Sequence, residues 1–265
     1  IISTQSVTKR ILTSLKRLEY RGYDSAGISA IKNRKIERCR AAGKLSNLER
    51  ALVKQPISGS IGIGHTRWAT HGVPSIENAH PHVSGQVAVV HNGIIENYQQ
   101  LKEELAKDGV KMRTETDTEV VAHLANAYLQ AGIQPKEMME ALLSKIQGAF
   151  ALLIMMAQHP DTLLAARKYS PLAIAYGDDE MFLGSDALAL AHLSRKISYL
   201  EDGDWAIITK DEAKIFNLKN EIVERPSKIT DASNKTPDKG KYAHYMEKEI
   251  NEQPEVIGYT FASYC

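Results

Sequence analysis

Residues 65–93 read HTRWATHGVPSIENAHPHVSGQVAVVHNG, and this stretch decides how the rest of the chain is interpreted. Five of the nine histidines of the protein lie within it. Two apolar runs, residues 61–64 (IGIG) and 87–90 (VAVV), lead directly into its polar clusters. A strand buried on both faces is rigid, and polar groups that follow its end are held in a defined geometry. The stretch therefore predicts an active site at the ends of two buried strands.

The triplet His91-Asn92-Gly93 admits two interpretations. Glycine permits close backbone approach, so the N–H of Gly93 can point at a ligand, and Asn92 adds a side-chain amide donor. Two convergent donors suit the oxyanion that forms during acyl transfer. The alternative is a strand that ends in a turn, because Asn-Gly is the strongest short hairpin signal. Taken alone, the triplet favours the turn.

Three further features fit the binding of a zwitterion. Arg67 follows a strand, where a guanidinium is a planar fork for a carboxylate, although a surface ion pair is the plainer interpretation. Residues 68–72 (WATHG) resemble a loop that folds over a ligand, or an ordinary surface loop. Asp117 opens a helix, so it either caps that helix or accepts hydrogen bonds from a substrate ammonium. Arg67 and Asp117 together would clamp an α-amino acid, but nothing in the sequence forces them into contact.

The histidines and cysteines give little support for a metal or a reactive thiol. His80 and His82 could both face one side of an extended segment, but no cysteine or carboxylate stands at ligand spacing. We therefore predict no metal and no cofactor, and expect these histidines to shape the pocket. Cys39 lies between Arg38 and Arg40, whose side chains point to the opposite face of a strand, so we expect a packed residue.

Composition narrows the class of protein. The chain has 265 residues, a formal net charge of +1, 43% hydrophobic and 25% charged residues, as in ordinary soluble proteins. This charge balance argues against a nucleic-acid partner. The longest apolar run, residues 148–157, is too short to span a membrane. Two cysteines cannot form a disulfide framework, which favours a reducing cytoplasm.

Hydrophobic periodicity predicts many strands, with the helices in two groups. Residues 1–2 look like the end of a strand. Helices are expected at residues 6–18 (capped by Ser6), 44–53, 96–107, 116–129, 135–146, 185–192 (capped by Ser185) and 242–251, the last ended by Pro254. Strands are expected at residues 27–31, 35–41, 61–66, 149–156, 162–167, 172–176, 181–184, 197–200, 205–209 and 214–218. Residues 225–241 have the composition of a linker. This order suggests sheets stacked between helical layers.

Five stretches occur in an order and spacing that resemble one family. They are RGYDSAG at 21–27, HTRWATHG at 65–72, NAHPH at 78–82, HNGIIEN at 91–97 and TDTEV at 116–120. Together they resemble the glutaminase domain of the glutamine–fructose-6-phosphate aminotransferases, a class II glutamine amidotransferase. The resemblance covers the chain except residues 255–265. Related amidotransferases for phosphoribosylamine and asparagine usually lack the WATH and AHPH stretches, so the aminosugar branch is favoured.

This resemblance implies a fold, a substrate and a set of roles. The fold is α+β, a four-layer αββα N-terminal-nucleophile hydrolase with two stacked antiparallel sheets. The substrate is L-glutamine, whose ammonia would convert fructose 6-phosphate to glucosamine 6-phosphate. By resemblance, Asn92 and Gly93 form the oxyanion hole, Arg67 holds the α-carboxylate and Asp117 the α-ammonium. The remaining implied site residues are Trp68, Thr70 and His71 of the closing loop, Arg21 near the nucleophile and His80 in support.

The resemblance also implies what lies beyond this site. Residues 1–228 would be the glutaminase domain, and residues 229–265 a linker and helical segment leading to a sugar-isomerase domain, through which the protein would form a homodimer. The family's nucleophile is an amino-terminal cysteine, whereas this sequence begins at Ile1. The chain as given is therefore expected to be inactive. Two other possibilities remain open: a glutamine-binding module without catalysis, or a glutaminase domain that serves another acceptor, such as phosphoribosyl pyrophosphate.

Overall fold

The computed structural model describes residues 1–230 and 240–264. Its helices are α1 (Thr8–Lys16), η1, a short 3₁₀ helix (Glu19–Arg21), α2 (Leu45–Lys54), α3 (Tyr98–Lys107), α4 (Thr118–Gln130), α5 (Pro135–Lys145), α6 (Ala187–Leu190) and α7 (Tyr245–Tyr264). Its strands are β1 (Ser25–Lys32), β2 (Lys35–Ala42), β3 (Ile61–Arg67), β4 (His82–Ser84), β5 (Val87–Ile95), β6 (Gly148–Met156), β7 (His159–Lys168), β8 (Ala173–Gly177), β9 (Glu180–Gly184), β10 (Lys196–Tyr199), β11 (Trp205–Ile208), β12 (Ala213–Phe216), β13 (Ile222–Val223) and β14 (Ser227–Ile229). None of the described helices is long and apolar enough to cross a membrane.

The strands form two antiparallel layers. One layer is a seven-stranded sheet in the order β13-β12-β11-β7-β6-β5-β4. The other consists of two groups, β2-β1-β3 and β14-β10-β8-β9, joined by the first residues of the chain. Ile2 exchanges backbone hydrogen bonds with Met181 of β9, and the amino group of Ile1 donates to Gly62 O of β3 at 2.9 Å. The expected strand at the start of the chain thus completes the second layer.

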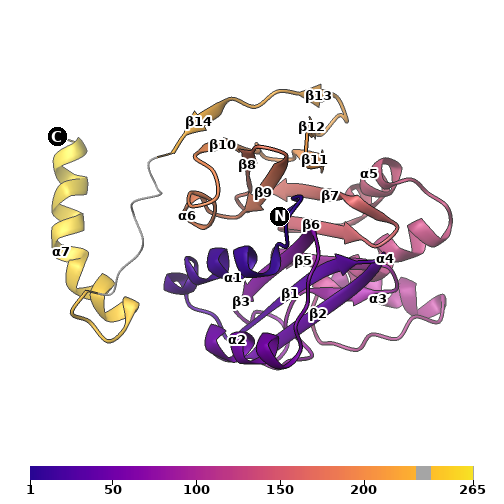
Figure 1. Ribbon diagram of the computed structural model, residues 1–265, viewed down its shortest axis with the longest axis horizontal. Helices are drawn as coiled ribbons and strands as arrows, with labels where there is room; N and C mark the ends of the chain where they lie inside the picture. The colour runs from indigo at the N-terminus through magenta and orange to yellow at the C-terminus, as the bar shows by residue number, and fades with distance from the viewer. Residues whose placement is uncertain (231–239, 265) are drawn as a thin grey trace.

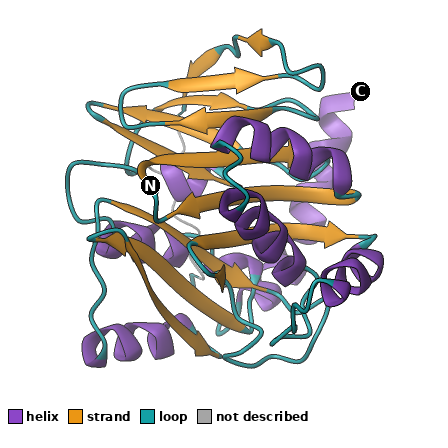
Figure 2. Ribbon diagram, turned by 90° about the vertical axis from the view of Figure 1, so that its right-hand side faces the viewer, coloured by secondary structure: helices purple, strands orange, loops and turns teal. Residues whose placement is uncertain are grey.

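Three apolar cores show how the layers stack. Val89, Leu124 and Met138 belong to the core between the seven-stranded sheet and helices α3–α5. A second core fills the space between the two sheets and includes Ile63 and Val90. The third core packs α1 and α2 against the outer face of the other sheet, and its members include Ile11, Leu15, Ile28 and Leu48. The order is therefore helices, sheet, sheet, helices (Figures 1 and 2).

β5 shows why the centre of the molecule is rigid. Val87 and Val89 contact the helix-side core, whereas Ala88 and Val90 contact the core between the sheets. The strand is therefore buried on both faces, as its unbroken apolar sequence predicts. β5 pairs with β6 along its whole length, but β4 covers only its first residues, up to Val89. The edge of β5 beyond Val89 is consequently not paired with β4.

Several expected helix boundaries are wrong. Ser6 does not cap α1, which begins at Thr8, and Asp186 rather than Ser185 caps α6 by accepting from the N–H of Leu188. Helix α7 does not end at Pro254 but continues through it to Tyr264. The expected strands are present in the structure, and the turn at Asn33-Arg34 is confirmed by the positive φ of both residues.

Three short strands were not predicted, and one of them falls in the expected linker. They are β4, β13 and β14, each of two or three residues, too short for a period to show. β14 pairs with β10 and spans residue 228, the expected domain boundary. Residues 231–239 of the expected linker lie outside the described residues, as does Cys265. The division at residue 228 remains a prediction.

Candidate active site

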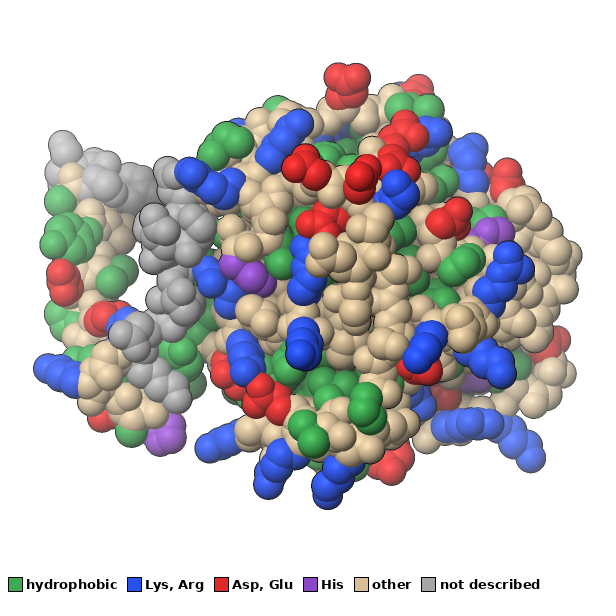
Figure 3. Space-filling model, in the orientation of Figure 1, with side chains coloured by type: hydrophobic (Ala, Val, Ile, Leu, Met, Phe, Trp, Pro, Cys, Tyr) green, Lys and Arg blue, Asp and Glu red, His purple; other side chains and the backbone are tan. Residues whose placement is uncertain are grey.

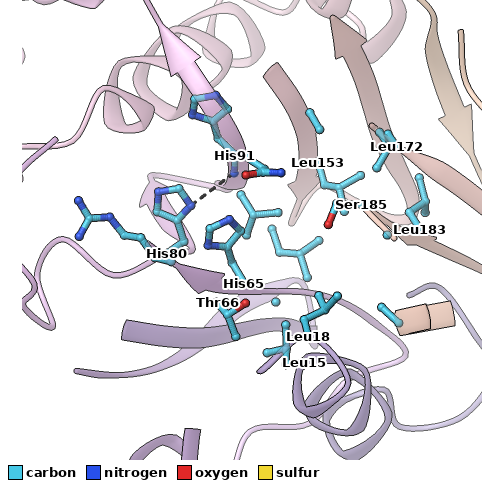
Figure 4. Close-up of a pocket in the computed structure, with 18 of the residues that line it drawn as sticks. Leu15, Leu18, His65, Thr66, His80, His91, Leu153, Leu172, Leu183 and Ser185 are labelled. Carbon is cyan, nitrogen blue, oxygen red and sulfur yellow. Dashed lines mark hydrogen bonds between the residues drawn. The ribbon is translucent and has the colours of Figure 1, made fainter. Parts of the chain in front are cut away.

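A cavity of about 460 Å³ lies where β3 and β5 meet the start of α4, and Ile1 also lines it. The structure brings most of the predicted site residues together here. Those that line the cavity are Arg21, Arg67, Trp68, Thr70, His80, Asn92, Gly93 and Asp117. His71 is the exception: its backbone oxygen accepts from Arg67, and its ring packs edge-on against Tyr98 at 5.2 Å between centroids. Figure 4 shows His65, His80 and His91 around the cavity, with Leu153 and Leu172 on its apolar side.

Asn92 and Gly93 do not form a hairpin turn. β5 continues through both residues, and they pair with Ala151 and Phe150 of β6. The turn interpretation of the triplet is therefore wrong. Gly93 is nevertheless unusual, because its φ is +135° and a Cβ there would lie 2.0 Å from the backbone oxygen of Ala149. Only glycine fits this position, since every other side chain would meet the neighbouring strand.

The unpaired edge of β5 carries backbone donors that point toward the cavity. The N–H of His91 donates to Nδ1 of His80 at 3.4 Å, and the N–H of Ile95 donates to Oδ2 of Asp117 at 2.8 Å. Alternate residues of a strand direct their N–H groups to the same edge. This alternation directs the N–H of Gly93 to the same edge, between the other two. The arrangement can offer that donor, beside the exposed amide of Asn92, to an oxygen in the cavity.

Arg67 is a buried cation with an unused donor. The residue is 4% exposed, and its Nη2 donates to the backbone oxygens of His71 and Gly72. Within the described part of the chain, its Nη1 has no hydrogen-bond partner, although Oδ1 of Asp24 lies 3.8 Å away. Burial lowers the pKa of Arg67, while the carboxylates of Asp24 and Asp117 oppose this shift. An unsatisfied buried guanidinium nitrogen is costly unless an anion satisfies it.

Asp117 precedes α4 but does not cap it. Its side chain makes no cap hydrogen bond to the helix and instead reaches β5, where it accepts from Ile95 N. The capping interpretation is therefore wrong. Asp117 is 4% exposed, lines the same cavity as Arg67 and is among the charges that act on that guanidinium. The fold thus places the buried cation of Arg67 and the buried anion of Asp117 in one cavity, which the sequence alone could not establish.

Residues 68–72 form a loop at the mouth of the cavity. Trp68 is 64% exposed, and its ring lies against Gly22, where an added Cβ would come within 2.4 Å of Cζ3. The N–H of Ala69 donates to Oδ2 of Asp24 at 2.5 Å. Arg21 lines the rim and pairs with Asp186. The sequence interpretation quoted Asp24 within a motif but gave it no role.

Four histidines form a contiguous group at the cavity: His80, His82 and His91 are buried, and His65 is half-buried. The ring centroids of His65 and His80 are 4.4 Å apart, and those of His80 and His82 are 4.7 Å apart. His82 bonds to Oγ1 of Thr116, and His91 to Oγ1 of Thr118. Burial lowers the pKa of His65 and of His82 to about 3 and that of His80 well below its ordinary value. Burial also lowers the pKa of His91, opposed by Asp117. All four rings are therefore neutral near pH 7.

Among residues 1–230 and 240–264, no three or more His, Cys, Asp or Glu side chains are arranged so that they could hold a metal ion. Cys39 is buried, as expected, and burial raises the pKa of its thiol. On the face shown in Figure 3, basic side chains are spread widely and acidic ones gather near the upper edge. The cavity therefore combines the buried cation of Arg67, the buried anion of Asp117 and backbone donors at the edge of β5.

Comparisons with known proteins agree with this geometry. A family model for a glutamine amidotransferase domain matches residues 65–192. Over its whole length the chain is 52% identical to the glutamine–fructose-6-phosphate aminotransferase [isomerizing] of Zymomonas mobilis and 53% identical to that of Rhizobium meliloti. It spans 44% and 43% of these relatives, less than half of their length.

Among solved structures, the chain resembles the glutamine phosphoribosylpyrophosphate amidotransferase of B. subtilis, with a TM-score of 0.69 and 27% identity, covering 83% of this chain and 49% of that one. It also resembles an allosteric regulatory enzyme of purine biosynthesis, with a TM-score of 0.67 and 29% identity, over 79% of this chain and 46% of that one. These likenesses, together with the stacked antiparallel sheets, confirm the predicted four-layer αββα N-terminal-nucleophile hydrolase fold.

Proposed function

The chain belongs to the class II glutamine amidotransferases, and from this premise we propose that it hydrolyses L-glutamine to glutamate and ammonia. It would do so as the glutaminase part of a glutamine–fructose-6-phosphate aminotransferase. The observation that carries the proposal is the unsatisfied Nη1 of Arg67 in a cavity that Asp117 also lines. An α-amino acid brings one carboxylate and one ammonium, which match this pair of opposite charges.

The nucleophile in this proposal is the thiol of an amino-terminal cysteine. Ile1 lines the cavity, and Ile2 is paired with Ile61 of β3. An extended segment ahead of Ile1, continuing in this antiparallel register, would run beside Ile63 and Gly64 toward His65. Its end would then reach the cavity. A terminal α-amino group has an ordinary pKa of about 7.7–8.0, so it can accept the thiol proton near neutral pH.

The reaction proceeds in two balanced steps. The thiolate attacks the side-chain carbonyl carbon of glutamine, and the oxyanion of the tetrahedral intermediate accepts hydrogen bonds from Asn92 and from the N–H of Gly93. The intermediate collapses to a glutamyl thioester and expels ammonia, which takes the proton that the amine accepted. Water then attacks the thioester, releases glutamate and regenerates the thiol. Throughout, Arg67 holds the α-carboxylate and Asp117 the α-ammonium.

The remaining residues support binding. Trp68, Thr70 and His71 belong to the loop that closes over glutamine, Arg21 lies at the rim near the nucleophile, and His80 supports β5 by accepting from His91. Neither a metal nor a cofactor enters this reaction. Residues 1–228 would form the glutaminase domain, and residues 229–265 would lead to a sugar-isomerase domain of the same polypeptide. We further propose a cytoplasmic homodimer that assembles through that second domain.

The acceptor is fructose 6-phosphate in this proposal, because the relatives at 52–53% identity are named for it. Phosphoribosyl pyrophosphate has less support, since the structure named for it is 27% identical. A glutamine-binding module without catalysis would keep the Arg67–Asp117 pair but would not need strand-edge donors.

The proposed function is tested with two proteins that differ in one atom. Both carry a short apolar strand ahead of Ile1, one beginning with an unblocked cysteine and the other with serine in its place. The cysteine form is expected to release ammonia from glutamine, and the serine form is expected to release none above background. Ammonia and glutamate are measured together, with intact mass confirming each terminus. A cysteine form that binds glutamine without hydrolysing it would support the binding-module alternative instead.

Replacing Arg67 with alanine in the cysteine form is expected to raise KM for glutamine about 100-fold. The reason is that the charge-assisted hydrogen bond from the buried Nη1 to the α-carboxylate is lost, and hydrogen bonds to charged groups contribute about 1.5–3 kcal/mol. The change in kcat should be much smaller, because the interaction exists equally in the ground state and the transition state. Steady-state kinetics measures both constants. An unchanged KM would show that Arg67 does not hold the substrate.

A further inference from the structure

Asn78 stands in one of the quoted motifs but has no part in the proposed chemistry. It is 3% exposed, and its side chain uses both its acceptor and its donor group. The Nδ2 group donates to Val73 O at 3.0 Å and to Oε2 of Glu115 at 3.0 Å. The Oδ1 atom accepts from the N–H of Glu115 at 3.0 Å. Two hydrogen bonds therefore join Asn78 to Glu115: the Asn78 side chain donates to the Glu115 carboxylate and accepts from the Glu115 backbone N–H.

Glu115 joins this pair to the end of the loop. Its Oε2 accepts from the N–H of Val73 at 3.1 Å, so one carboxylate oxygen receives both Val73 and Asn78. The packing at this point is tight, because a Cβ on Gly72 would lie 2.7 Å from both Nδ2 of Asn78 and Cβ of Glu115. Gly72 also has a φ of +78°, which favours glycine. The end of the loop is therefore packed tightly against the side chains of Asn78 and Glu115.

The same contacts connect the two halves of the substrate site. Arg67 donates to the backbone oxygen of Gly72, next to Val73, and Glu115 stands two residues before Asp117. The carboxylate of Glu115 also opposes the lowering of the pKa of Arg67. The backbone that carries the cation and the backbone that carries the anion therefore meet at Asn78 and Glu115.

We propose that Asn78 and Glu115 are positioning residues that clamp the end of loop 68–72 and couple it to the segment bearing Asp117. This inference rests on the proposed glutaminase function and deepens it. Without the clamp, the loop and the anion would move independently, so glutamine would have to order both when it binds. The loss would appear in substrate binding rather than in the chemical step.

Two disruptive variants and one conservative variant test the clamp in the cysteine form. Asn78→Asp removes the donor to Val73 O and sets two carboxylates against each other. Glu115→Ala removes the shared acceptor. Glu115→Gln keeps an oxygen at that position, so it preserves both contacts and removes only the charge. Glu137→Ala, on the exposed surface of α5, is the matched control.

The two disruptive variants are expected to raise KM for glutamine about tenfold, as the loss of one or two hydrogen bonds would. Their kcat should stay within about threefold, and Glu115→Gln and Glu137→Ala should keep KM within about twofold. A second readout needs no catalysis: chymotrypsin cleavage after Trp68, followed by mass spectrometry, should be about tenfold faster in Asn78→Asp and Glu115→Ala only, since local release of the loop exposes that bond.

These readouts separate the two proposals. If the cysteine form without further substitution releases no ammonia but the variants show the expected cleavage by chymotrypsin, the proposed function fails while the clamp stands. If the reference protein is active and all variants share its KM and its cleavage rate, the clamp is refuted while the function stands. Thermal unfolding followed by circular dichroism identifies a variant that is globally destabilised, and either disruptive variant alone then suffices for the comparison.

Discussion

Replacing Asn92 with aspartate is expected to lower kcat for glutamine hydrolysis about 100- to 1000-fold, as the loss of one oxyanion donor does in other enzymes. The substitution keeps the size of the side chain but removes its N–H donor and places a negative charge where the oxyanion forms. KM should change little, because the donor meets charge that develops only in the transition state. Asn92 is exposed in β5, so folding should be unaffected.

The matched control is Asn97→Asp, two residues after the end of β5 and directly before α3. Asn97 donates to the backbone oxygen of Lys145 and accepts from the N–H of Gln147, so it has a structural role. This variant is expected to lose the bond to Lys145 and some thermal stability while retaining kcat. Steady-state kinetics and thermal unfolding are measured on both variants. If Asn92→Asp retains kcat within threefold of the reference, Asn92 is not an oxyanion donor.

The contrast between the triplet and its surroundings shows what the sequence could predict. Residues 87–90 correctly predict a buried strand, because an unbroken apolar run is typical of a strand that is buried on both faces. The same sequence cannot show that the strand continues through Asn92 and Gly93, since the residues that pair with them, Ala151 and Phe150, lie about sixty positions further on. Pairing with β6 therefore outweighs the local preference of Asn92-Gly93 for a turn.

Asp117 illustrates the same limit for the site. An acidic residue before a helix satisfies every local rule for a cap, yet its carboxylate turns to β5. Pro254 likewise satisfies the rule for a helix end, although α7 continues through it. Most of the residues named from the five ordered motifs line one cavity, and their roles remain predictions. The motifs gave no role to Glu115, which the structure joins to Asn78 and Val73.

Acid is expected to unfold the protein, because three buried histidines and the half-buried His65 are neutral in the folded state. Burial lowers the pKa of His65 and His82 to about 3 and shifts His80 and His91 in the same direction. In the unfolded chain these groups titrate near pH 6.5. Between these values the unfolded state binds more protons than the folded state, so the free energy of unfolding falls as pH falls. The stabilisation is complete above pH 6.5 and is lost as pH falls toward 3.

Each such group contributes about 1.4 kcal/mol per pH unit while the pH lies between its folded and unfolded pKa, so His65 and His82 together contribute about 3 kcal/mol per unit between pH 6.5 and about 3. Against a total stability of about 5–15 kcal/mol, this slope predicts an acid midpoint below about pH 5. Urea unfolding at several pH values measures the slope, which should correspond to uptake of at least two protons. His82→Gln should reduce it by about one proton, whereas the exposed His244→Gln should leave it unchanged. A slope of one proton or fewer would mean that the histidine group is charged, or accessible to protons, in the folded protein.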